Sequence, residues 1–97
     1  MNEYIKGTDV ICEVKFRNAE RKLADPTVVI FKSEDPNNNV VTYQFGSGTE
    51  VIKDGVGMYH VNVDANLVGE WTYRFEATGT GKAADEDKFR VLPSSFP

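Results

Sequence analysis

Apolar and polar residues alternate along most of this chain. Between Asp9 and Arg17 nearly every second residue is apolar, and most of the residues between them are charged. Because successive side chains of a strand point to opposite faces, a period of two places one face in a core and the other in water. The pattern is clearest in Glu70–Thr78, where Trp71 and the residues two apart from it form the apolar face. The chain shows no stretch of useful length with the period of a helix.

Turn-forming residues interrupt the alternation about every 8–12 positions, a spacing typical of sandwiches and barrels. The strongest signals are Asp35–Asn39, which combines a proline with three asparagines, and Asp54–Gly57, which opens with Asp-Gly. The predicted strands are Asp9–Arg17, Thr27–Ser33, Val40–Phe45, Thr49–Lys53, Met58–Val63, Glu70–Thr78 and Asp87–Leu92. The sequence therefore predicts an all-β fold, an immunoglobulin-like antiparallel β-sandwich of about seven strands.

The alternation also predicts the core. Cys12 falls at an inward position, and a free cysteine is far more often a buried core residue than a reactive thiol. It is the single cysteine of the chain, so an intramolecular disulfide is excluded. We expect Trp71 at the centre of the core. Its predicted neighbours are Val14, Phe16, Phe31, Tyr59, Tyr73 and Phe89.

Length and charge narrow the functional classes. The 97 residues suit one domain spanning 1–97. The net charge is −4 and basic residues are dispersed, which disfavours nucleic acid as a partner because phosphate binding needs clustered positive charge. We expect no membrane partner, since no window approaches the ~20 apolar residues of a membrane helix. The first residues also lack the apolar segment of a signal peptide.

Catalytic chemistry has few candidates. The chain has one histidine and one cysteine, and it lacks a Gly-Xaa-Ser-Xaa-Gly motif, so no nucleophile and base pair suggests itself. We therefore predict a protein that is not an enzyme, with no catalytic residue, cofactor or metal. Calcium is the one inorganic alternative, through a loop formed by Asp85–Asp87 together with Asp64. The competing interpretation is a solvated acidic loop.

One group of apolar residues falls on a face that should be polar. Val28, Ile30 and Val40 lie opposite the inward residues of their strands, so they form an outward apolar strip. Such a strip is either a contact surface or a surface covered by the loop Asn18–Asp25. The two ends of the chain, predicted to be free tails, add further apolar side chains. The candidate interaction surface is therefore Val28, Ile30, Val40, Tyr4, Ile5 and Phe96.

Several short motifs suggest a family. Gly57-Met58-Tyr59-His60-Val61 is followed by Gly69-Glu70-Trp71-Thr72-Tyr73-Arg74-Phe75, and the last strand is preceded by Ala83-Ala84-Asp85-Glu86. With Asp25-Pro26-Thr27 and the opening Lys6-Gly7-Thr8, the chain resembles small immunoglobulin-like proteins encoded in the structural regions of tailed phages and prophages. The resemblance covers nearly the whole chain.

This resemblance implies a virion protein assembled in the host cytoplasm. We expect a capsid decoration or cement protein that binds the major capsid protein, or another virion protein at the neck or tail. Self-association on the particle is a further expected contact. The alternative is an immunoglobulin-like adhesion module that binds a carbohydrate or a receptor, on a tail or a cell surface. The family implies no catalytic residues.

Overall fold

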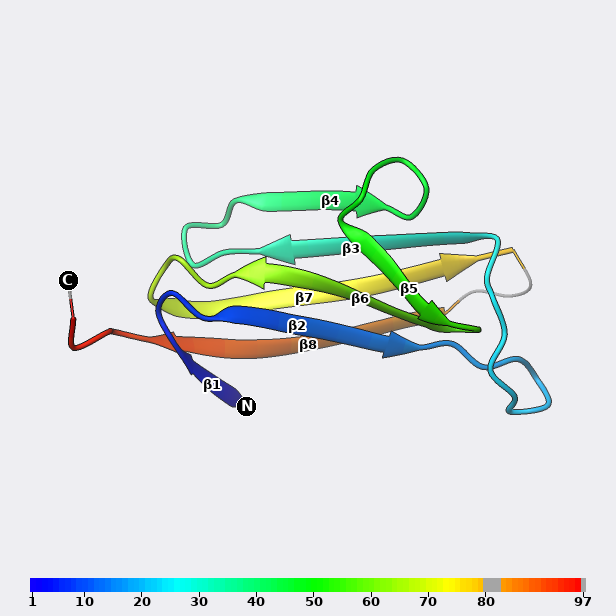
Figure 1. Ribbon diagram of the computed structural model, residues 1–97, viewed down its shortest axis with the longest axis horizontal. Coiled ribbons are helices and arrows are strands. Elements are labelled where there is room, and N and C mark those ends of the chain that lie inside the picture. The colour runs from blue at the N-terminus through cyan, green and yellow to red at the C-terminus, as the bar shows by residue number, and fades with distance from the viewer. Residues whose placement is uncertain (80–82, 97) are drawn as a thin grey trace.

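The computed structural model describes residues 1–79 and 83–96, and these residues form eight strands and no helix (Figure 1). Within that part of the chain there is accordingly no helix long and apolar enough to cross a membrane. The strands are β1 Asn2–Ile5, β2 Asp9–Lys15, β3 Val28–Glu34, β4 Val40–Gln44, β5 Val51–Gly55, β6 Met58–Asp64, β7 Gly69–Thr78 and β8 Ala83–Leu92. The prediction of an all-β fold is confirmed.

The strands form two sheets that pack against each other. One sheet has five strands in the order β1-β8-β7-β3-β4, and the other has three in the order β2-β6-β5. Figure 1 shows the three-stranded sheet lying over the five-stranded sheet. The molecule is elongated, with dimensions of 47 × 25 × 21 Å. The chain passes between the sheets after β1, β2, β4 and β6, so most sequential strands are not neighbours in one sheet.

Two strands differ from the predictions. Asn2–Ile5, expected as a free tail, is the parallel partner of β8, and all other paired strands are antiparallel. The contact of Tyr4 with the core offsets the entropy that this segment loses on ordering, because the ring of Tyr4 meets the ring of Phe89 edge-on at 5.6 Å. β8 begins at Ala83 and not at Asp87, because the backbone of the acidic run pairs with β7 between Tyr73 and Phe75. The other six predicted strands agree with the structure to within two residues at each end.

The core lies between the two sheets. Phe31 and Phe75 are fully buried at its centre, with their ring centroids 5.0 Å apart. Trp71 is buried as predicted, but it lies nearer one end, where it stacks on Phe89 at 5.7 Å. The predicted partners Phe16 and Tyr59 form a pair of their own. The buried hydrophobic residues are Val10, Cys12, Val14, Phe16, Val29, Phe31, Val51, Tyr59, Val61, Val63, Ala65, Trp71, Phe75, Ala77, Phe89 and Val91.

The turns gather at the two ends of the sandwich. The end from which residues 93–96 project also carries the turns at residues 6–8, 35–39 and 65–68, and we call it the tail end (Figure 1). At the opposite end the loop after β2 is fixed by Asp25. The Asp25 carboxylate accepts hydrogen bonds from Gly57 N–H at 2.8 Å and from Lys53 Nζ at 2.8 Å. Asp25 therefore ties this loop to the hairpin of β5 and β6.

Candidate binding surfaces

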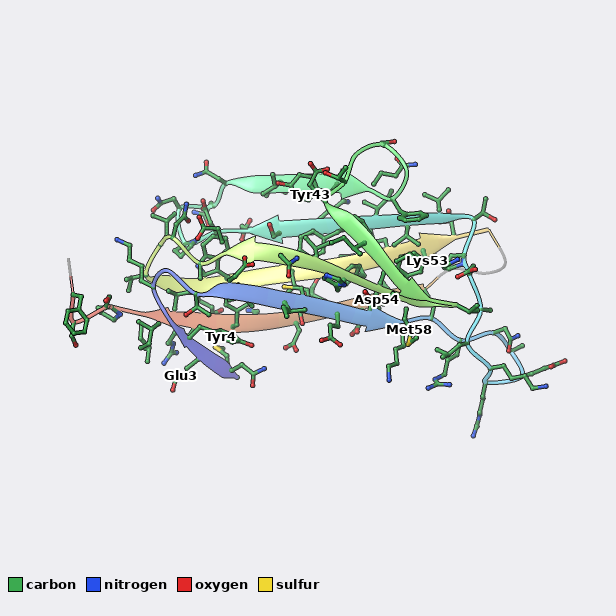
Figure 2. All side chains as sticks on the ribbon, viewed as in Figure 1. Glu3, Tyr4, Tyr43, Lys53, Asp54 and Met58 are labelled. Carbon is green, nitrogen blue, oxygen red and sulfur yellow. The ribbon has the colours of Figure 1, made fainter. Side chains whose placement is uncertain are left out.

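The six residues of the predicted interaction surface do not lie together. Tyr4 packs against the core, and Val28 and Ile30 are half-buried on the outer face of β3. Val40, Ile5 and Phe96 are exposed. Figure 2 shows Tyr4 on β1 at one edge of the sandwich and Tyr43 of β4 at the other. β1 and β4 are the two edge strands of the five-stranded sheet, so Ile5 and Val40 lie on opposite edges.

The outward strip is interrupted by charge. Val40 pairs with Glu34, and Lys32 lies between Glu34 and Ile30 on the same face of β3. An apolar strip that is continuous from Val28 to Val40 is therefore absent from this face. The orientation of these residues was predicted correctly. The same alternation puts Lys32 on this face, whereas the pairing of Val40 with Glu34 is seen only in the structure.

Ion pairs cover the middle of this outer face. Glu76 of β7 accepts a hydrogen bond from Arg74 Nε at 2.8 Å and lies 3.3 Å from Lys32 Nζ. Arg74 also lies 3.5 Å from Glu86 of β8. The two cations, Arg74 first, lower the pKa of the Glu76 carboxyl below its ordinary value. This network makes the centre of the face a charged surface in contact with solvent.

The loop at residues 18–25 is held by the other sheet. Ala24 N–H donates to the carbonyl of Phe16, and Asp25 binds the β5–β6 hairpin as described above. None of these contacts involves Val28, Ile30 or Val40. The interpretation that the loop covers an apolar strip therefore has no support in its contacts.

A smaller apolar patch lies at the tail end. Ile5 is 49% exposed and pairs with Leu92 across β1 and β8, with both side chains on the outer face. Val68 is also exposed, and it directly precedes Gly69, which pairs with Val91 of β8. Phe96, 83% exposed, follows in the projecting segment. We call these four residues the tail-end patch. Val68 was missed from the sequence, although the adjacent apolar pair Leu67-Val68 in a polar turn was a usable signal.

A groove opens along the side of the sandwich. β5 begins at Val51, opposite Val61, so Asn62–Asp64 of β6 have β2 on one side and, within the described part of the chain, no strand on the other. The inward face of β4 is therefore only partly covered, and Val41 is 41% exposed although it points inward. The space between them has a volume of about 370 Å³. We call it the side groove. It is lined by Ser33, Asp35, Val41, Tyr43, Asn62, Val63, Asp64, Asn66 and Trp71.

Comparison of the chain with protein-family models, with curated proteins and with solved structures finds no match. The fold class consequently rests on the strands and sheets themselves. The resemblance to phage immunoglobulin-like proteins stays a prediction.

The acidic run does not form the loop that was expected for calcium. Asp85, Glu86 and Asp87 lie within β8, where alternation puts Glu86 on the outer face beside Arg74 and the two aspartates on the other face. Asp64 ends β6 in the other sheet. In the described residues no three histidine, cysteine or acidic side chains are grouped as metal ligands would be. The carboxylates of a strand diverge to two faces, so the acidic run does not bring its three oxygen donors to one point.

Proposed function

We propose that this protein is a non-enzymatic structural component of a tailed-phage virion, with an immunoglobulin-like fold, that binds the major capsid protein through the tail-end patch. Two features support the immunoglobulin-like assignment. The strand order is that of an immunoglobulin sandwich whose first strand pairs with the last strand instead of the second: β2-β6-β5 corresponds to B-E-D and β8-β7-β3-β4 to G-F-C-C′.

The second feature is a corner hydrogen bond. Immunoglobulin domains often carry a tyrosine near the start of strand F whose hydroxyl bonds to the backbone a few residues upstream. In this chain Trp71 occupies the start of β7, and its Nε1–H donates to the carbonyl of Leu67 at 3.0 Å. The indole therefore fixes the turn before β7 in the way that the tyrosine does in those domains.

The observation that carries the docking proposal is that Phe96, Ile5 and Val68 are all exposed and belong to segments at the same end of the sandwich. Large apolar side chains gathered at one end of a small domain are costly to leave in water, and contact with a partner removes that cost. Charged side chains border the patch, since Glu3 and Arg90 lie on the same face of β1 and β8. An apolar centre with a charged rim is the usual composition of a protein interface.

A symmetric shell would present such a contact many times over. An interface of standard size buries about 800 Å² on each partner, and a patch of four apolar residues with its rim supplies only a modest part of the affinity. Occupancy of each capsid site is set by the free concentration of the protein relative to the Kd, so such a contact covers a particle when the protein is abundant during assembly. A one-domain protein with a small docking surface suits this use.

The experiment compares two matched isoleucine variants. Ile5→Glu alters the tail-end patch, whereas Ile11→Glu alters an isoleucine of similar exposure, 57%, on the outer face of β2. Each purified protein is mixed with particles of the encoding phage or prophage that were assembled without it, and bound protein is measured by co-sedimentation. We expect Ile5→Glu and Phe96→Ala to weaken binding at least about tenfold, and Ile11→Glu to bind as the unmodified chain does.

The result that overturns the docking proposal is equal binding by Ile5→Glu, Phe96→Ala and the unmodified chain. Failure of the unmodified chain to co-sediment with any of its own particles overturns the virion assignment as a whole. Circular dichroism spectra of all variants establish that a loss of binding is not a loss of fold.

A further inference from the structure

The strand β4 forms an open edge of the five-stranded sheet. It pairs with β3 on one side, and among residues 1–79 and 83–96 no strand pairs with its other side. Figure 1 shows β4 along the upper edge of the molecule. Val40 is 60% exposed there, and Val41 and Thr42 are exposed as well. An open edge presents unpaired backbone donors and acceptors to another extended chain.

The sequence of β4 lacks the features that protect an open edge. Its five residues, Val-Val-Thr-Tyr-Gln, include no charged residue and no proline, and most of them favour strands. The other edge strands of the described chain, β1, β2 and β5, each contain a charged residue, and β5 also has a bulge between Lys53 and Gly55. Charges and bulges discourage pairing with another chain. An additional strand therefore pairs most readily with β4.

The backbone groups on the open side of β4 belong to Val40, Thr42 and Gln44. Phe45 N–H, at the end of the strand, donates to a carbonyl of β3 at 3.0 Å. Because the backbone groups of successive residues in an antiparallel strand point to opposite sides, those of residues 40, 42 and 44 face away from β3. The carbonyl of Gln44 already accepts Ser47 N–H at 3.1 Å, so Gln44 offers only its own N–H.

A second copy of β4 matches this edge in antiparallel orientation. With Thr42 on the two-fold axis, its N–H and C=O groups bond those of Thr42 in the copy, and Gln44 N–H bonds the carbonyl of Val40 in the copy. Val41 then lies opposite Tyr43 of the copy, at positions where antiparallel strands bring side chains closest together. Aromatic and β-branched residues form favourable cross-strand pairs, as do two threonines.

No residue of β4 brings like charges together in this pairing. The nearest charges on the outer face, Lys32 and Glu34, lie one strand further in, on β3. From the open edge, its lack of charge and its self-complementary register, we propose that the chain forms a two-fold dimer in which two β4 strands join the five-stranded sheets of both copies. The dimer does not use the tail-end patch, and it does not depend on the proposed function.

The size of this contact predicts a weak dimer in solution. A pairing of two five-residue strands is smaller than the about 800 Å² that each partner buries in an interface of standard size. The dimer fraction should therefore rise steeply with protein concentration. Because the two-fold pairing occupies the β4 edge of both copies, association ends at the dimer.

The first experiment measures molecular mass against concentration by sedimentation equilibrium. From about 10 µM to about 1 mM, the unmodified chain should convert from monomer to dimer. Thr42→Lys places two lysines opposite each other across the axis, and it should lower the association constant at least about tenfold. Thr78→Lys is the matched control, because Thr78 is an exposed threonine on the outer face of β7 and the charge change is the same. This control should dimerise as the unmodified chain does.

The second experiment tests the register by mild oxidation. Thr42→Cys brings two thiols to the axis with Cα atoms about 5.5 Å apart, within the range of about 4.4–6.8 Å for a disulfide. Val40→Cys is the control, because Val40 lies opposite Gln44 of the copy and its thiols are more than about 10 Å apart. The native Cys12 is buried and does not compete. We expect a covalent dimer from Thr42→Cys alone.

A chain that remains a monomer at about 1 mM overturns the inference. Dimerisation that Thr42→Lys leaves unchanged, assemblies larger than a dimer, and cross-linking by Val40→Cys without cross-linking by Thr42→Cys overturn it as well. Circular dichroism establishes that each variant is folded. Ile5→Glu should dimerise as the unmodified chain does, so this inference and the docking proposal fail separately.

Discussion

Replacing Trp71 by alanine removes the largest side chain of the core and the corner hydrogen bond together. The indole is 5% exposed, stacks on Phe89 at 12° between ring planes, and donates its Nε1–H to Leu67. Truncation of a buried tryptophan to alanine costs about 3–5 kcal/mol, chiefly from lost burial and the cavity left behind. Since total stabilities are about 5–15 kcal/mol, Trp71→Ala should leave a barely folded protein.

A phenylalanine variant divides this loss into two parts. Trp71→Phe keeps an aromatic ring against Phe89 but leaves the carbonyl of Leu67 without its donor. We expect a loss of about 1–2 kcal/mol, of which the hydrogen bond accounts for about 0.5–1.5 kcal/mol. The difference between the alanine and phenylalanine variants then measures the packing contribution of the ring.

Urea denaturation followed by far-ultraviolet circular dichroism measures both changes. Fluorescence is unsuitable because Trp71 is the single tryptophan of the chain. With a slope of about 1.3 kcal/mol per molar urea, a loss of 4 kcal/mol lowers the midpoint by about 3 M. Ile11→Ala, an exposed position on β2, is the control and should change stability by less than about 0.5 kcal/mol. An unchanged midpoint for Trp71→Ala would refute the packing argument.

Two further predictions concern ionisable groups. Burial, with a smaller effect of Asp87, raises the pKa of the Cys12 thiol to about 12, so iodoacetamide at neutral pH should modify the native chain far more slowly than the urea-unfolded chain by mass spectrometry. Equal rates would contradict the burial of Cys12. The Lys53 ammonium, followed by Gly57 N–H, lowers the pKa of the Asp25 carboxyl below 3.8, so its ionised form stabilises the fold above that pH and the contribution disappears as the pH falls through the lowered value. Thermal melts should therefore show a weaker acid-induced fall in melting temperature for Asp25→Asn than for the unmodified chain or for Asp9→Asn, and identical curves would contradict the role of Asp25.

Local alternation determined much of this fold. In β2 the residues Val10, Cys12 and Val14 are buried and their neighbours are exposed, as the period of two requires. The Asp35–Asn39 turn ended β3 and preceded β4 where expected, because these residues favour turn geometry whatever surrounds them. The hairpin at Asp54–Gly57 was also expected, but Asp54 and Gly55 belong to β5 and the turn itself is Val56-Gly57. The strands of the core could thus be predicted from the sequence, since each depends on its own pattern of side chains.

Pairing partners decided the strands that the pattern did not show. Asn2–Ile5 is too short to reveal a period of two. It forms a strand because it pairs with the edge of β8 and because Tyr4 packs against Phe89. The acidic residues at the start of β8 lack an apolar face, yet they extend the strand because β7 continues beside them. Both depend on contacts between residues distant in the sequence, which a local pattern does not encode.

The candidate sites depended on the unequal size of the sheets. The sequence correctly placed Val41 and Tyr43 on an inward face. An aromatic residue at an inward position is predicted to be buried in the core. Only the tertiary structure shows that β5 begins at Val51, opposite Val61, and does not extend along the rest of β6. This inward face is therefore partly uncovered, and Ser33 lines an open groove. Alternation specifies which face of a strand a side chain occupies, whereas the extent of the opposing sheet decides whether that face is buried.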